Sequence, residues 1–423
     1  MGERSSSNRP GVPRARAANR GAAAVGWTAV GLAGAVVAAT AAASALAVTM
    51  ARRIVTPPVN REEDVRILAV GEVSITLSAT PDSLTPGQYS FWFSRESGHA
   101  RVGEILDYTS STVTRTLLGI DFGDLSVARR GRLSGWYFLR PRDLGVPYES
   151  MVVDTPLGPA PAWLIPAPVD SGSWVIQVHG RAVRRSETLR AVTVFRDAGY
   201  TSLLVSYRND GDAPRTPDNR YSLGDAEWQD VDSAIRYALD NGARDIVLMG
   251  WSMGGATVLQ AATRSELSWA IRGIVLESPV IDWVSVLDYQ GAEAKVPRVI
   301  RRGALGILGH AWGRAVTGLR SPIDLARLDF VRRSADLHWP ILLLHSDDDG
   351  YVPSGPSREL ATARPDIVTF VPFVTARHVK LWNYDAAKWT TAIAGWLEGL
   401  APLVISPGSS AHTGRSSHRP EAG

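Results

Sequence analysis

Strand-like and helix-like segments alternate along the sequence from Met151 onward. Short apolar runs of strand length are separated by longer stretches with a helical period. Such alternation is typical of βαβ units, in which successive strands pair in parallel and helices cover the sheet. The expected strands are 174–178, 201–206, 245–249, 271–277, 341–344 and 368–374. We therefore predict an α/β fold with a mostly parallel sheet and helices on both faces.

Helices are expected between these strands and at the end of the domain. One is expected over 186–198, and Ser222 with Asp225 has the spacing of a capping pair for a helix that ends near 241. The last helix is predicted over 382–400. The segment 279–340 lacks strand alternation, and we predict that it forms a short helical cap over the site. The residues expected on the underside of this cap are Trp283, Leu305, Ile307, Leu308 and Trp312.

A Gly-x-Ser-x-Gly sequence lies between an expected strand and an expected helix. It reads Gly250-Trp251-Ser252-Met253-Gly254. In a tight strand-to-helix turn the flanking residues must be very small, and the serine is held in a strained, exposed position above the sheet. Glycines in such a turn also occur for packing alone, so the motif needs partners elsewhere in the chain. The chain has no cysteine, so a side-chain nucleophile of this kind has to be an oxygen.

A serine hydroxyl becomes a good nucleophile when a base removes its proton, and that base needs a carboxylate to orient it. His378 follows the expected strand 368–374, and an acidic run, Asp347-Asp348-Asp349, follows the strand 341–344. Because parallel strands end at the same edge of a sheet, these groups should meet near Ser252. His99 does not follow a strand of the expected parallel sheet, and we expect it to be a solvated surface histidine.

With these residues in place, the segment from Val152 to Leu400 resembles an α/β-hydrolase of the serine hydrolase kind, similar to the bacterial esterase and prolyl-oligopeptidase-like branches. The usual segment of this family is His-Gly-x-x-Asp-x-x-Val-Pro. The chain reads His345-Ser346-Asp347-Asp348-Asp349-Gly350-Tyr351-Val352-Pro353, which departs from the pattern at Ser346. The resemblance implies Ser252 as nucleophile, His378 as base and Asp349 as acid. Asp347, Asp348 and Glu277 remain alternative acids.

The turn His179-Gly180-Arg181 resembles the His-Gly turn that builds the oxyanion hole of the family. The resemblance implies two backbone N–H donors, those of Met253 and Arg181. We expect the His179 side chain to be structural. No phosphate-binding glycine loop and no His-Glu-x-x-His sequence occurs, and we expect neither a metal nor an organic cofactor.

Positive charge is concentrated near the N-terminus. The formal net charge is +3, yet the first twenty residues carry five arginines against one glutamate, and Arg52 and Arg53 add two more. The body of the chain is therefore mildly acidic, and its scattered arginines do not resemble a nucleic-acid groove. Residues 21–51 carry no charge. As a helix this stretch is about 45 Å long, which exceeds the ~30 Å hydrocarbon core of a bilayer.

We predict a single-pass transmembrane helix over 21–51, preceded by a basic tail over 1–20. The positive-inside rule then places the N-terminus in the cytoplasm and the catalytic domain outside it. The alternative is a signal peptide cleaved at the small-residue site Ala45-Leu46-Ala47, which would release a secreted protein. A soluble alanine-rich helix is less consistent with the absence of a polar face.

Between this helix and the α/β domain, residues 60–150 contain short β segments with Pro and Gly between them. We predict a small β-rich module there, the α/β-hydrolase domain over 151–402 and a disordered tail over 403–423. The predicted function is hydrolysis of an acyl bond, most simply a carboxylic ester, in a small-molecule or lipid-like substrate, with no obligate protein partner. A peptidase or thioesterase would use the same residues, and a non-catalytic anchored binding module is the alternative of another class.

Overall fold

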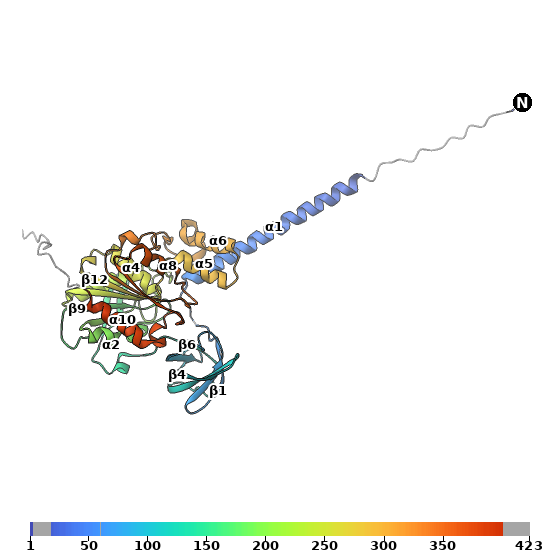
Figure 1. The fold of residues 1–423 in the computed structure, drawn as a ribbon. Helices are drawn as coiled ribbons and strands as arrows, with labels where there is room; N and C mark the ends of the chain where they lie inside the picture. Colours follow the sequence, from blue (N-terminus) through green and yellow to red (C-terminus); the bar gives the residue numbers. More distant parts are fainter. Residues whose placement is uncertain (3–17, 60, 401–423) are drawn as a thin grey trace, which may run out of the picture.

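The computed structural model of the chain describes residues 1–2, 18–59 and 61–400. The expected tail 403–423 and most of the expected basic segment 1–20 lie outside the described residues. Three parts follow one another along the chain: a long N-terminal helix, a six-stranded β-barrel and an α/β body (Figure 1).

The α/β body is built on one eight-stranded sheet in the order β14-β13-β12-β11-β9-β10-β8-β7. Six neighbouring strands, from β14 to β10, run parallel, and β8 and β7 are added antiparallel at one edge. The predicted mostly parallel sheet is therefore confirmed. The strands are β7 Glu149–Thr155, β8 Gly158–Ile165, β9 Ser173–Val178, β10 Thr201–Val205, β11 Asp245–Trp251, β12 Ile271–Glu277, β13 Ile341–Ser346 and β14 Val368–Phe373.

Helices cover both faces of this sheet (Figure 1). One face packs against α3, α4 and α8, and the other against α2, α9 and α10. The α-helices of the body are α2 Val192–Asp197, α3 Trp228–Asp240, α4 Met253–Arg264, α5 Trp283–Glu293, α6 Arg298–Gly309, α7 Arg314–Thr317, α8 Gly355–Ala363, α9 Leu381–Tyr384 and α10 Ala386–Glu398. Both faces are apolar, and each strand of the sheet centre is buried along nearly its whole length.

Two helix starts differ from the sequence prediction. The helix expected over 186–198 begins as a 3₁₀ segment, Arg185–Ala191, and only then becomes α2. The capping pair is wrong: α3 begins at Trp228, and Asp225 instead receives hydrogen bonds from Arg264 and Arg327 at 2.9 and 3.0 Å. A charged partner satisfies a carboxylate better than a helix start does, so tertiary contacts overrode the local pattern.

The β-rich module is a closed barrel of six strands in the order β1-β2-β5-β4-β3-β6. Its strands are β1 Val65–Val70, β2 Ser74–Ser78, β3 Tyr89–Phe93, β4 Gly98–Tyr108, β5 Thr112–Phe122 and β6 Arg130–Ser134. The expectation for His99 is wrong, because its side chain is 0% exposed and lies between Asp121 and Ser90, at 2.8 and 2.7 Å. The barrel joins the body through Asn383, which exchanges two hydrogen bonds with the backbone of Gln88.

The N-terminal helix α1, Ala18–Val55, leaves the body as a long rod and packs on it only near its C-terminal end (Figure 1). Ala43, Ala47 and Ala51 recur every fourth residue on the packed face. Small residues at this spacing allow close helix contact, and a Cβ built on Gly303 of α6 would lie 3.3 Å from the Cβ of Ala47. Among the described residues, the stretch Val37–Val55 is long and apolar enough to cross a membrane.

The expected cap is present as α5, α6 and α7, but its role differs in part from the prediction. Trp283 lies beside Ser252 in a narrow cleft, as expected of a residue on the underside. Trp312 does not, since it is 62% exposed. Ile307 and Leu308 are buried, and Leu305 is partly buried, in the core that α6 shares with α1. The second helix of the cap is therefore mainly a docking surface for α1.

Candidate active site

Ser252 occupies the turn between β11, the central strand, and α4. Its backbone has φ 51° and ψ −118°, a conformation that side-chain-bearing residues rarely adopt. The turn is as tight as the motif predicts: a Cβ on Gly250 would lie 2.5 Å from the carbonyl oxygen of Gly254, and one on Gly254 would lie 2.2 Å from that of Val178. Both positions therefore exclude any larger residue, and the turn presents Ser252 at the carboxyl edge of the sheet.

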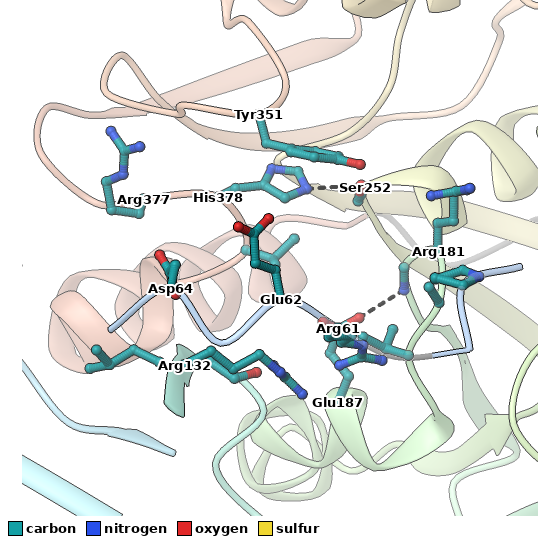
Figure 2. Close-up of a pocket in the computed structure, with 18 of the residues that line it drawn as sticks. Arg61, Glu62, Asp64, Arg132, Arg181, Glu187, Ser252, Tyr351, Arg377 and His378 are labelled. Carbon is teal, nitrogen blue, oxygen red and sulfur yellow. Dashed lines mark hydrogen bonds between the residues drawn. The ribbon is translucent and has the colours of Figure 1, made fainter. Parts of the chain in front are cut away.

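His378 and Asp349 meet at this serine. The Nε2 atom of His378 lies 3.0 Å from Oγ of Ser252, and its Nδ1 atom lies 2.7 Å from Oδ2 of Asp349. Figure 2 shows the imidazole pointing at Ser252 from the loop after β14. The structure thus brings together the three side chains that the sequence singled out, each after a different strand of the same sheet.

Asp349 is held firmly in this arrangement. Its Oδ1 atom accepts hydrogen bonds from the backbone N–H groups of Tyr351 and Val352 at 2.9 and 2.8 Å, which leaves Oδ2 for His378. Burial raises the pKa of the Asp349 carboxyl, but the charge of His378 and the contacts with His378 and His345 lower it more, so the pKa lies well below its usual range. The group is a carboxylate that orients an imidazole.

The alternative acids are engaged elsewhere. Asp347 pairs with Arg358 at 2.6 Å, and Asp348 pairs with Arg377 at 3.1 Å. Glu277 is buried, and its Oε2 atom accepts hydrogen bonds from the indole N–H groups of Trp251 and Trp389 at 2.9 and 2.8 Å. None of the three contacts His378, so the geometry favours Asp349.

The loop after β9 lies directly against Ser252. A Cβ built on Gly180 would be 3.4 Å from the Cβ of Ser252. The N–H of Gly180 donates to Glu187 at 2.7 Å, while the N–H of Arg181 has no acceptor among the described residues. Met253 is the first residue of α4, where a backbone N–H has no partner within the helix. The backbone N–H groups of Met253 and Arg181 thus have no acceptor among the described residues, and their role as oxyanion donors stays a prediction.

His179 has a structural position. Its ring stacks on Tyr207 at 4.3 Å, and Nδ1 lies 2.8 Å from the carbonyl oxygen of Gly180. Complete burial lowers the pKa of His179 to about 3, so the imidazole is neutral at physiological pH. Together with the hydroxyl of Tyr207, which donates to the same carbonyl at 2.7 Å, it fixes the turn that carries Arg181.

A cavity of about 930 Å³ opens beside Ser252 and His378. All three parts of the chain line it (Figure 2), and the residues from α1, the linker after it and the barrel include Arg53, Thr56, Arg61, Glu62, Arg132 and Ser134. The sequence did not indicate that α1, the linker and the barrel would line the cavity. In the sequence, Arg52 and Arg53 indicate only the charged flank of a membrane helix. Among the described residues, no group of three His, Asp or Glu side chains could hold a metal ion.

A second, narrower cleft of about 30 Å³ is also lined by Ser252. Its walls are apolar and come from α1, α5 and the loop after β13; they include Ile54, Val280, Trp283, Val286, Leu287 and Val352. Ser252 therefore lines both a wide cavity that holds many charged side chains and a narrow apolar cleft.

Comparison with known families agrees with this fold. The model of the alpha/beta hydrolase family matches residues 167–393, which is more than half of the chain. The chain belongs to the alpha/beta hydrolase family. Residues 66–134 of this hydrolase, which form the barrel, match a separate domain of unknown function.

Several relatives of the hydrolase are known by name. Human "Protein ABHD12B" is 29% identical over 204 residues, covering 45% of this chain and 49% of that protein. The "Uncharacterized protein YfhR" of Escherichia coli is 27% identical over 130 residues, covering 30% of this chain and 45% of that protein. The hydrolase thus matches about half the length of each. An esterase of Pyrococcus furiosus has a similar structure, with a TM-score of 0.49 and 18% identity over 62% of this chain and 94% of that chain.

Proposed function

We propose that the hydrolase cleaves carboxylic esters through an acyl-enzyme formed on Ser252. The observation that carries this proposal is the hydrogen-bonded series from Ser252 Oγ to His378 Nε2, at 3.0 Å, and from His378 Nδ1 to Asp349 Oδ2, at 2.7 Å. In this series His378 takes the proton of the serine as the hydroxyl attacks the carbonyl carbon, and returns it to the leaving alcohol. Asp349 holds the imidazole in the required tautomer and stabilises its charged form.

Charge on the substrate oxygen is stabilised by the N–H groups of Met253 and Arg181. Such donors are already oriented before the reaction, and losing one typically costs about 2.7 to 4 kcal/mol of transition-state stabilisation. Water then enters the wide cavity and, with His378 as base, attacks the acyl-enzyme. The free acid leaves and Ser252 regains its proton.

The two spaces beside Ser252 suit the two halves of an ester. The apolar cleft lined by Ile54 and Trp283 accepts the acyl group, and its small volume of about 30 Å³ favours short acyl chains. The cavity of about 930 Å³ accepts the alcohol part and the attacking water. We therefore place a small-molecule ester ahead of a long-chain lipid.

The test is covalent labelling together with a substrate panel. A fluorophosphonate should modify the parent protein and not Ser252→Ala, because the reagent needs an activated serine. The p-nitrophenyl esters should be hydrolysed more slowly as the acyl chain lengthens, and peptide anilides should be cleaved poorly. Equal labelling of both proteins would contradict the mechanism. Faster cleavage of anilides would favour a peptidase, and the absence of any labelling or turnover would favour a binding module.

We also propose that α1 is retained as a membrane anchor, with the body on the extracytoplasmic side. The alternative cleavage site, Ala45-Leu46-Ala47, lies inside the helix where it packs on α6, and Ala47 is buried there. Cleavage would cut the contact surface between α1 and the body. Among the side chains of α1 that the structure describes, Ala43 is the first that packs on the body; the part of the helix before it, 18–42, spans about 37 Å, enough for a bilayer.

This proposal predicts that the full-length protein is recovered in the membrane fraction and is released by detergent but not by alkaline carbonate. Protease that reaches the outer side of the cytoplasmic membrane but does not cross it should degrade the body, because the body is proposed to lie on that side. Mass spectrometry of the purified protein should find peptides from both sides of Ala47. A protein in the soluble fraction, or one whose first residue lies after Ala47, would contradict the anchor.

A further inference from the structure

The C-terminal end of α1 forms part of the wall of the catalytic cavity. The last carbonyl groups of a helix have no partners within it and must find other donors. Here one side chain supplies donors for two of them and for the next carbonyl after the helix: Nη2 of Arg181 lies 3.2, 2.8 and 3.1 Å from the carbonyl oxygens of Arg53, Ile54 and Thr56. The side chain that closes the end of α1 therefore belongs to the residue that follows Gly180 beside Ser252 and whose backbone N–H has no acceptor among the described residues.

The backbone around Arg181 is fixed on both sides. The N–H of Gly180 donates to Glu187 at 2.7 Å, and the N–H of Ala182 donates to Asp210 at 3.0 Å. Ala182 has a φ of +60°, which costs free energy for a residue with a Cβ and persists only where its surroundings hold it. Among the described residues, the N–H of Arg181 alone in this turn has no acceptor.

Tyr221 connects the same loop to α1 by a second route. Its ring lies under the guanidinium of Arg181, 4.7 Å from centroid to Cζ, and its backbone N–H donates to the carbonyl oxygen of Val55 at 2.8 Å. Its hydroxyl donates to Asp210, the carboxylate that holds Ala182. The end of α1, Arg181, Tyr221 and Asp210 thus form a closed ring of contacts around the turn.

We propose that Arg181 is a positioning residue whose side chain couples the docked end of α1 to the oxyanion hole. With α1 docked, the three carbonyl groups hold the Arg181 side chain and its Cα, and the backbone N–H points at the substrate oxygen. Without these carbonyl groups the Arg181 side chain is no longer held, and the backbone N–H of Arg181 is no longer oriented toward the substrate oxygen. This proposal rests on the proposed function, because it concerns the donor that stabilises the acyl transition state.

The first test replaces Arg181 by methionine, which keeps the backbone N–H and the length of the side chain but removes its donors. The full-length protein in detergent should show kcat lowered about 10- to 100-fold, less than the 10²- to 10³-fold typical of a lost donor, with KM nearly unchanged. The inhibition constant for a trifluoromethyl ketone, which binds as an oxyanion, should rise by the same factor as kcat falls. A general loss of packing would not link these two quantities.

Arg184→Met is the matched control, because Arg184 lies in the same loop but its side chain is exposed and forms an ion pair with Asp212, at 3.8 Å, rather than with α1. It should keep the parental kcat. If Arg181→Met also keeps it while the parent hydrolyses esters, the coupling is wrong and the proposed function stands. If the parent itself is inactive toward esters and fluorophosphonates, the proposed function fails instead.

A second test approaches the contact from the helix. Ala51 is fully buried between α1 and the body, so Ala51→Glu should undock the end of α1, whereas Thr49→Glu places the same charge on an exposed position of the helix. We expect Ala51→Glu to lower kcat as Arg181→Met does, and Thr49→Glu to leave it unchanged. Because both changes break one coupling, the double variant should be no slower than the slower single variant. Losses that multiply would overturn the proposal.

Discussion

Replacing Ser252 by alanine is expected to lower kcat for p-nitrophenyl acetate by about 10⁶-fold, the loss found when the nucleophile of a serine hydrolase is removed. The change deletes one oxygen from a side chain that is 7% exposed. It leaves the strained backbone of the turn and both glycines in place, so the protein should fold normally. Steady-state kinetics with a thermal unfolding curve for each protein measure the two effects separately.

Ser354→Ala is a suitable control, since Ser354 lies at the same edge of the sheet and contacts Asp347 rather than His378. Its kcat should stay close to that of the parent. If Ser252→Ala retained more than about a hundredth of the parental kcat, well above the residual rate that binding and an oxyanion hole supply alone, another group would have to be the nucleophile.

Replacing Asp349 by asparagine is expected to lower kcat by about 10⁴-fold, because an amide at this position stabilises the wrong tautomer of the histidine. An amide also cannot stabilise the imidazolium that forms when His378 takes the proton. The geometry of the loop should be kept, since Oδ1 of the amide can still accept the two backbone hydrogen bonds from Tyr351 and Val352. Steady-state kinetics at pH 7 to 9 would measure the loss.

The neighbouring carboxylates provide matched controls. Asp347→Asn and Asp348→Asn make the same chemical change two residues and one residue away, where the side chains pair with Arg358 and Arg377, respectively. Exposed ion pairs of this kind contribute little to stability, so both variants should keep kcat within a few-fold of the parent. A loss in Asp348→Asn as large as that in Asp349→Asn would mean that the acid has been assigned to the wrong residue.

The body of the protein could be predicted from local pattern because its strands are short apolar runs with distinct boundaries. The carboxyl ends of these strands carry Ser252, Asp349 and His378, and a parallel sheet necessarily brings such ends to one edge. The three residues could be placed at one edge of the sheet without knowing the order of the strands within it. The catalytic roles of the three residues remain predictions, although their distances agree with them.

Features that depend on contacts between distant segments could not be predicted. The spacing of Ser222 and Asp225 resembled a helix cap, but arginines far along the chain compete for that carboxylate. His99 resembled a surface residue because nothing near it in the sequence reveals that β3 and β5 enclose it. The contribution of α1 to the cavity was hidden in the same way, since Arg53 and Arg181 are separated by 128 positions.

Because the cavity is lined by segments far apart in the sequence, it forms late during synthesis of the chain. The ribosome synthesises the end of α1 before the barrel, and the barrel before the histidine of the site, so the cavity cannot be complete until His378 has emerged. Ser252 meets its base 126 residues later, and Arg181 has to find a helix end made 128 residues earlier. On the proposed mechanism, a nascent chain has no complete site until His378 has been synthesised and the end of α1 has docked on the body.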